Sequence, residues 1–213
     1  MLGKLILALV CALAAIGYGQ ATWVFFDRFL ETPRIFVAPI VGGMVYLSVW
    51  FFRFSHRHRF WSVLEHELIH LFFAWITFRK VHAIHVVRGG GGRAEVDGDN
   101  LLIALSPYFF PFLAILILLF KPGIPANLQA VPNFFLGMAW MAHLLHLADE
   151  FNPFQPDIRR GGMVVSLLIV AFLNLFFFGM TIAGLAGRWQ DLADFWRIGA
   201  EAIVALFGLR FAG

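Results

Sequence analysis

Six long apolar runs divide this chain of 213 residues, and they constrain its fold more than any other feature. One crossing of a bilayer needs about 20 apolar residues, so each run predicts a spanning helix. Their approximate bounds are 5–26, 35–52, 60–78, 101–120, 133–147 and 162–186. Hydrophobic residues make up 61% of the chain and charged residues 14%, whereas soluble domains carry about 25% charged residues. The surroundings expected from this composition are a lipid bilayer.

Two further segments have patterns of their own. Residues 81–87 and 93–96 contain alternating β-branched residues on either side of four glycines, which predicts a short hairpin, with a polyglycine linker as the alternative. Residues 188–213 mix charged side chains with Trp189 and Trp196, which is typical of an interfacial amphipathic helix. The predicted fold is an all-α polytopic membrane protein of about six transmembrane helices. It has a β-hairpin between the third and fourth helices and an amphipathic C-terminal helix.

We expect three parts along the chain: two N-terminal transmembrane helices in 1–59, a membrane core in 60–187 and the amphipathic segment in 188–213. The net charge is only +3, and the basic residues are scattered between apolar runs, so nucleic acid is not an expected partner. The same scatter leaves the membrane orientation open. Nothing in the pattern indicates an oligomeric state.

The third apolar run contains a motif that can bind a metal. Residues 66 to 70 read His-Glu-Leu-Ile-His. On a helix His66 and His70 leave the same face, so two imidazoles can bind one ion, and Glu67 beside them can act as a base. Two histidines packed by accident in a helix bundle are the alternative. Ionisable residues at membrane depth usually mark function, which favours the metal site.

A catalytic zinc site needs a third protein ligand, and Asp157 is the best candidate. It lies in a proline-broken stretch, 150–158, between the fifth and sixth apolar runs. Irregular backbone at membrane depth is tolerated where it lines a cavity, so this carboxylate could turn inward. A solvated loop aspartate beside Arg159 and Arg160 is the alternative.

At these positions the chain resembles the site-2 protease family of intramembrane zinc metallopeptidases, in its divergent, compact branch. The resemblance covers about residues 60–186. It rests on the H-E-x-x-H motif, on a hairpin segment after it, and on four residues of a later Asn-Pro-rich segment: Asn152, Pro153, Pro156 and Asp157. The family pattern ends in Asp-Gly, whereas Ile158 follows Asp157 in this chain.

The resemblance implies a metallopeptidase that contains Zn²⁺. His66, His70 and Asp157 would hold the ion, and Glu67 would activate water for attack on a peptide bond in or near a transmembrane segment of a substrate protein. The expected location is the cytoplasmic (inner) membrane of a prokaryote.

Other polar residues within the spans leave alternatives open. His143 and His146 in the fifth run could line the zinc cavity, orient a ligand or contact substrate, as could Asn152. With nearby carboxylates the same histidines suit a di-iron membrane oxidase or hydroxylase. Ser106 begins a Ser-Pro-Tyr break in the fourth run, which could contact substrate or be a packing kink. A non-catalytic membrane scaffold subunit is the third possibility.

Overall fold

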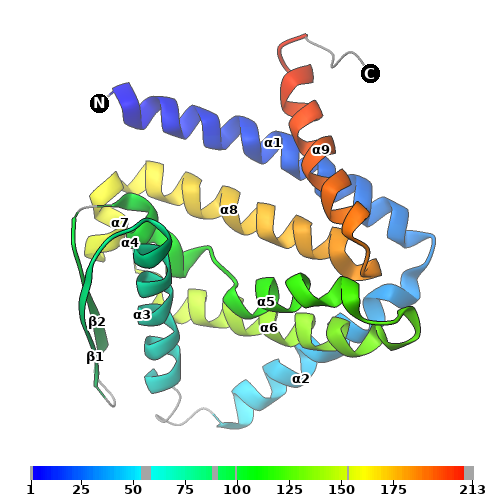
Figure 1. Cartoon of the computed structure of the whole chain (residues 1–213), viewed down its shortest axis with the longest axis horizontal. Helices are drawn as coiled ribbons and strands as arrows, with labels where there is room; N and C mark the ends of the chain where they lie inside the picture. Colours follow the sequence, from blue (N-terminus) through cyan, green and yellow to red (C-terminus); the bar gives the residue numbers. More distant parts are fainter. Residues whose placement is uncertain (1, 54–58, 88–90, 99, 153, 209–213) are drawn as a thin grey trace.

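The computed structural model describes residues 2–53, 59–87, 91–98, 100–152 and 154–208. Helices predominate (Figure 1). The α-helices are α1 (Leu2–Leu30), α2 (Val37–Arg53), α3 (Arg59–Ile76), α4 (Leu101–Leu105), α5 (Phe112–Phe120), α6 (Ala130–Glu150), α7 (Pro156–Gly161), α8 (Met163–Ala183) and α9 (Trp189–Ala205). Short 3-10 turns are η1 (Pro33–Phe36), η2 (Ser106–Tyr108), η3 (Lys121–Gly123), η4 (Ala126–Leu128) and η5 (Gly184–Ala186).

Each predicted apolar run forms helix, but fewer helices than predicted meet the requirements of a membrane span. In the described part of the chain, three segments are long and apolar enough to cross a bilayer: Leu2–Leu30, Pro33–Phe52 and Met163–Ala186. A bent pair, α4 with α5, is a fourth candidate. The helices α3 and α6 occupy the third and fifth runs without meeting that standard, since polar side chains lower their hydropathy. Three or four spans are therefore supported, where about six were predicted.

The fourth run is two helices instead of one. α4 and η2 end at Tyr108, α5 begins at Phe112, and the two parts are bent by 84°. Pro107 and Pro111 explain the break, because proline has no backbone N–H for the helical ladder and its ring clashes with the preceding turn. The predicted interruption of the fourth run is confirmed, and the two parts together remain a candidate for one span.

The long helices pack in pairs at glycines. α1 lies along α8, and α2 packs across α6 (Figure 1). A Cβ atom on Gly42 of α2 would lie 1.9 Å from the Phe134 carbonyl oxygen, and one on Gly137 of α6 would lie 1.8 Å from the Pro39 carbonyl oxygen. No larger residue fits where backbones approach this closely, which is a common way for membrane helices to associate.

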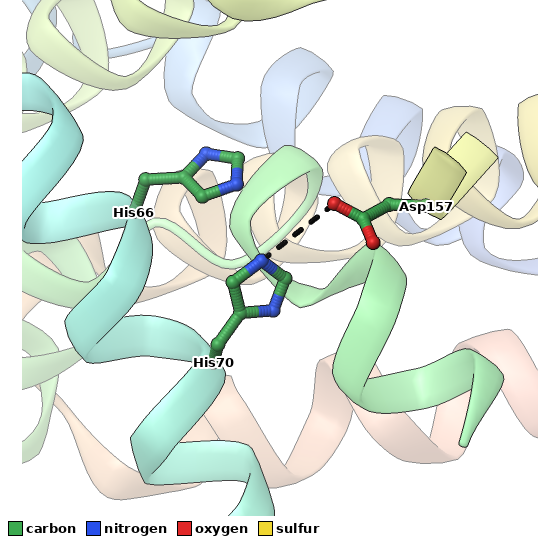
Figure 2. A group of neighbouring side chains, drawn as sticks. All are labelled: His66, His70 and Asp157. Carbon is green, nitrogen blue, oxygen red and sulfur yellow. Dashed lines mark ion pairs between the residues drawn. The ribbon is translucent and has the colours of Figure 1, made fainter. Parts of the chain in front are cut away.

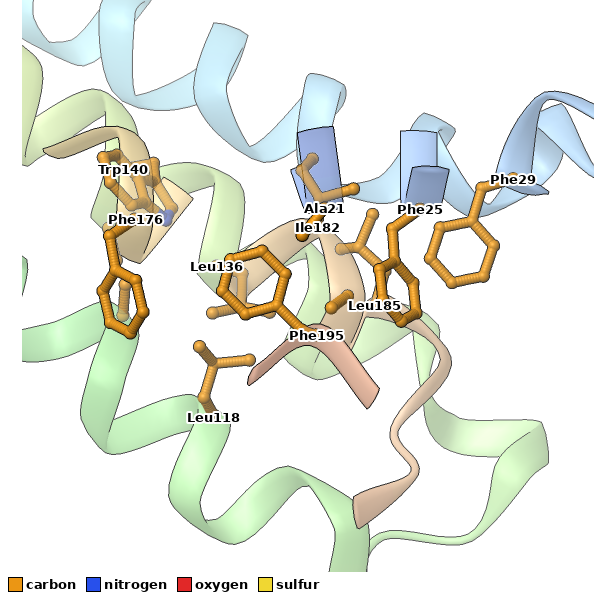
Figure 3. Packing of buried hydrophobic residues seen from close by; sticks show 13 residues of the cluster. Ala21, Phe25, Phe29, Leu118, Leu136, Trp140, Phe176, Ile182, Leu185 and Phe195 are labelled. Atoms are coloured by element: carbon orange, nitrogen blue, oxygen red, sulfur yellow. The ribbon is translucent and has the colours of Figure 1, made fainter. Parts of the chain in front are cut away.

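The predicted C-terminal helix is confirmed over Trp189–Ala205 as α9, which is partly buried in the protein, and residues 209–213 of the predicted segment lie outside the described residues. α9 crosses α1 and contacts the end of α8 (Figure 1). Its Phe195 is fully buried and lies among apolar side chains of α1, α6 and α8, including Phe25, Leu136 and Phe176 (Figure 3). The aromatic face of α9 thus completes the larger of two hydrophobic clusters.

A buried lysine closes the end of the α8 helix. Lys121, at the end of α5, has no exposed surface. Its Nζ donates hydrogen bonds to the carbonyl oxygens of Gly184 at 2.8 Å and Leu185 at 2.7 Å. Carbonyls at the end of a helix lack the usual partners of the helical ladder, and this side chain adds a donor to two of them where water is excluded.

We expect Lys121→Met to lower the free energy of unfolding by about 1–3 kcal/mol, because the variant loses two buried hydrogen bonds from a charged donor. Each carbonyl would retain one donor, the Gly187 backbone amide at 3.0 Å for Gly184 and the Asn133 side-chain amide at 3.1 Å for Leu185. Thermal unfolding in one detergent, with Lys80→Met at an exposed position as control, measures the difference. Equal stability of the two variants would contradict this role for Lys121.

The second hydrophobic cluster packs against the helix that carries the predicted site. It joins α3 to α4, α7 and α8 through side chains such as Ile69, Phe73, Tyr108 and Ile158. The predicted hairpin is confirmed as antiparallel strands β1 (Val81–Val87) and β2 (Gly91–Val96). Both strands pack against α3. The helix that bears the H-E-x-x-H motif is thus held between an apolar cluster and the hairpin.

Candidate metal centre

The structure brings the three predicted ligands together (Figure 2). His66 and His70 project from α3 toward Asp157 in α7. One ligand atom from each of the three residues lies within 4.8 Å of the others, and His70 Nε2 is 3.9 Å from Asp157 Oδ2. Among the described residues this is the group of His, Cys, Asp and Glu side chains with spacing suited to a metal.

Each histidine is held through its Nδ1 atom. His70 Nδ1 lies 2.8 Å from the Ile103 carbonyl oxygen, and His66 Nδ1 lies 2.7 Å from Glu150 Oε2. Since these partners accept hydrogen bonds, each Nδ1 carries the proton and each Nε2 keeps a free lone pair. Metal-binding histidines are commonly held in this way, which fixes both the tautomer and the ring orientation.

Glu67 is buried beside the two histidines and in contact with strand β2. Its carboxylate accepts a hydrogen bond from the Ala94 backbone amide. A Cβ atom on Gly92 would lie 2.5 Å from Glu67 Oε1 and 2.6 Å from Val63 Cγ1, so glycine permits the strand to approach α3. The hairpin therefore positions the predicted catalytic carboxylate as well as covering it.

These side chains line a cavity of about 710 Å³. α3, β2, α4 and α7 form its walls, and Glu150, Tyr108 and Gln155 also reach it. The Tyr108 hydroxyl donates a hydrogen bond to the Gln155 side-chain oxygen, and its ring packs against the edge of the His66 ring. The first three residues of β2, Gly91 to Arg93, line the cavity and are exposed, so water can enter beside this end of the strand.

The other predicted site residues lie away from this cavity. Ser106 is buried and donates a hydrogen bond to the Ile103 carbonyl oxygen, and Asn152 accepts one from the Phe154 amide. His143 Nε2 is 2.9 Å from the Asn174 side-chain oxygen. His146 Nδ1 is 3.2 Å from Glu65 Oε2 and its Nε2 is 3.4 Å from the Tyr46 hydroxyl. The two histidines of α6 thus belong to contacts with α8, α3 and α2.

Residues that the motif analysis did not assign contribute to the cavity. Glu150, Tyr108 and Gln155 all line it and contact one another or His66. The sequence signal that could have indicated Glu150 is its position four residues after His146. On a helix this spacing places the carboxylate on the same face as His146 and one turn closer to the proline-broken stretch that contains Asp157. Tyr108 lies in the proline-broken fourth run, where the chain changes direction. Neither signal identifies the partner residue.

His82 lies at the cavity rim in β1. Its Nε2 atom is 2.6 Å from Asp97 Oδ1, just past the end of β2. This hydrogen bond raises the pKa of His82 above its ordinary value and lowers the pKa of Asp97. The ion pair closes the open end of the hairpin.

We expect the His82 to Asp97 pair to support the hairpin most strongly between about pH 4 and 6.5. Because the pKa of His82 is raised in the folded protein, its contribution to stability is complete below about pH 6.5. This contribution is lost as the pH rises through the pKa of folded His82. Because the pKa of Asp97 is lowered in the folded protein, its contribution to stability is complete above about pH 3.9. This contribution is lost as the pH falls through the pKa of folded Asp97. Histidine NMR titration in detergent should give a His82 pKa above 6.5 that falls in Asp97→Asn. An unchanged value would contradict the pair.

The donor set fits zinc. Two imidazole nitrogens and one carboxylate oxygen are the ligands of many catalytic zinc sites, which keep a fourth position open. Ligand atoms around a tetrahedral ion at 2.0–2.2 Å lie roughly 3.3–3.6 Å apart. The separation of 3.9 Å between His70 Nε2 and Asp157 Oδ2 is slightly wider. The three ligand atoms lie within 4.8 Å of one another, so the group would have to contract to hold the ion.

Comparison of the chain with protein-family models, with curated proteins and with solved structures finds no match.

Proposed function

We propose that this protein is an intramembrane zinc metalloprotease of the site-2 protease type. The observation that carries the proposal is the convergence of His66, His70 and Asp157, with ligand atoms within 4.8 Å of one another, beside the buried carboxylate of Glu67. The location in a bilayer is supported by three segments of the described chain that are long and apolar enough to span one. The cytoplasmic membrane of a prokaryote remains the predicted membrane.

The residues of the cavity fit hydrolysis of a peptide bond. When bound, zinc would polarise the scissile carbonyl and lower the pKa of a water molecule toward neutrality. Glu67 accepts the proton of the attacking water and donates it to the leaving amine. Ala94 orients that carboxylate through its backbone amide, and the hydrogen bonds to Nδ1 keep both imidazoles turned toward Asp157.

The proposed substrate is a transmembrane segment of another protein. A helical substrate hides its carbonyl groups in hydrogen bonds within the helix, so the peptide bond has to leave the helical conformation before attack. Exposed backbone is tolerated at membrane depth only where protein or a water-filled cavity surrounds it, and in this proposal the cavity beside α3 has that role.

The test uses purified protein in detergent and one membrane-spanning substrate, with and without a Gly-Pro pair near its cleaved bond. We expect faster cleavage of the substrate with the pair, loss of cleavage with a zinc chelator and recovery on adding Zn²⁺. Equal rates for both substrates, or preferred cleavage of soluble unfolded peptides, would argue against cleavage within the membrane. Cleavage that survives chelation would argue against the metal.

A further inference from the structure

Glu150, the last residue of α6, contacts the metal centre from outside the set of proposed ligands. Its Oε2 atom lies 2.7 Å from His66 Nδ1, and its Oε1 atom accepts a hydrogen bond from the Ser62 hydroxyl. Ser62 and His66 are one turn apart on α3. Both carboxylate oxygens are therefore engaged by the helix that carries the motif.

The contact is shielded and directional. The His66 and Glu150 side chains are only 13% and 21% exposed, so water competes weakly for the hydrogen bond. Ser62 holds one oxygen of the Glu150 carboxylate, so the other oxygen points at His66. If the imidazole ring rotated about its Cβ–Cγ bond, it would lose this hydrogen bond. His66 Nε2 is then directed into the cavity, where Asp157 and His70 lie (Figure 2).

The two histidines differ in the charge of the group that accepts the hydrogen bond from Nδ1. His70 is held by a neutral carbonyl oxygen, that of Ile103, whereas His66 is held by a carboxylate. A carboxylate partner makes an imidazole a stronger electron donor and lowers the cost of placing it on a cation. Glu150 also brings a negative charge close to the place where the cation would sit.

Glu150 and Asp157 belong to consecutive helices, α6 and α7, and both line the cavity. Gln155, between them, accepts the hydrogen bond of the Tyr108 hydroxyl. One short stretch of chain is thus tied to α3 at Glu150 and to η2 at Gln155, and it presents Asp157 to the histidines.

We propose that Glu150 is a positioning residue of the metal centre, which holds His66 in its metal-binding orientation and strengthens its hold on the ion. This inference rests on the proposed zinc site and adds a residue to it that the H-E-x-x-H motif does not contain.

The test measures the zinc dissociation constant by competition with a chromophoric chelator, on the full chain in detergent. Glu150→Ala should weaken zinc binding by about 10–100-fold, the usual effect of removing such a partner. Glu150→Gln keeps an oxygen that accepts from His66 Nδ1 and loses only the charge, so it should recover part of this loss. The absorption of the Co²⁺-loaded protein should shift in the same order, because it reports the field of the ligands.

The matched control is Glu65→Gln. Glu65 is also a carboxylate of the contact between α3 and α6, but its partner is His146, which does not line the cavity. This variant should bind zinc as the unchanged protein does. Equal weakening in Glu65→Gln and Glu150→Ala would overturn the proposal, since it would indicate a general loosening of the two helices.

Zinc affinity of Glu150→Ala equal to that of the unchanged protein would also overturn the proposal. If the alanine variant does not fold, the glutamine variant decides, and unchanged zinc affinity with an unchanged Co²⁺ spectrum counts against it. Failure of the proposed function has a different signature: the unchanged protein would then bind no zinc, or bind zinc and cleave no substrate.

Discussion

Glu67→Gln should lower the rate of proteolysis by about 10²–10⁴-fold while the protein keeps one zinc per chain. The substitution preserves the shape of the side chain and removes its ability to take a proton. Glu67 accepts a hydrogen bond from the Ala94 amide, and the glutamine oxygen can accept the same bond. The hairpin should therefore stay in place. Cleavage rate and zinc content, measured on one preparation, give both quantities.

The control for Glu67→Gln is again Glu65→Gln, the same chemical change two residues earlier on α3 and outside the cavity. It should leave both quantities unchanged. Full activity of the Glu67 variant would exclude the proposed role of the carboxylate. Loss of zinc from the Glu67 variant would instead identify Glu67 as a ligand.

Asp157→Ala should weaken zinc binding by about 10²-fold or more. A structural site with four ligands contributes about 10–16 kcal/mol, so an even division assigns roughly 3 kcal/mol to each ligand. The carboxylate also supplies the negative charge among the three proposed ligands, and a methyl group replaces neither its lone pairs nor its charge. The same chelator competition used for Glu150 measures the effect.

Asp149→Ala is the matched control for Asp157→Ala, because Asp149 is an exposed carboxylate on α6 that does not line the cavity. It should bind zinc like the unchanged protein. Zinc affinity that survives Asp157→Ala would contradict the ligand assignment, and the ion would then need another third ligand.

The elements that could be predicted from sequence are those whose signal is local. The spacing of His66 and His70 fixes their common helix face, and the alternation around the glycines fixes the hairpin, so both predictions are confirmed. The prolines of the fourth run indicated a break, but the 84° bend depends on what α4 and α5 pack against. Local sequence carries no information about that packing.

Partners distant in sequence were beyond local reasoning. The approach of β2 to Glu67 depends on Gly92, whose sequence context suggests only a turn or linker. His143 and His146 looked equivalent as candidates for the cavity, yet the direction in which α6 faces its neighbours turns them toward Asn174 and Glu65. The same orientation of α6 about its axis places Glu150 beside His66. The helical pattern of a sequence predicts which residues share a face of the helix. It does not predict which other helix packs against that face.

Metal analysis of the purified protein is the most direct test of the central claim. The unchanged chain should contain one zinc, and a double variant, His66→Ala with His70→Ala, should contain none while keeping its helical content. Two irons per chain would favour a membrane oxidase or hydroxylase. A chain that takes up no metal when Zn²⁺ is supplied would contradict the metalloprotease and favour a scaffold.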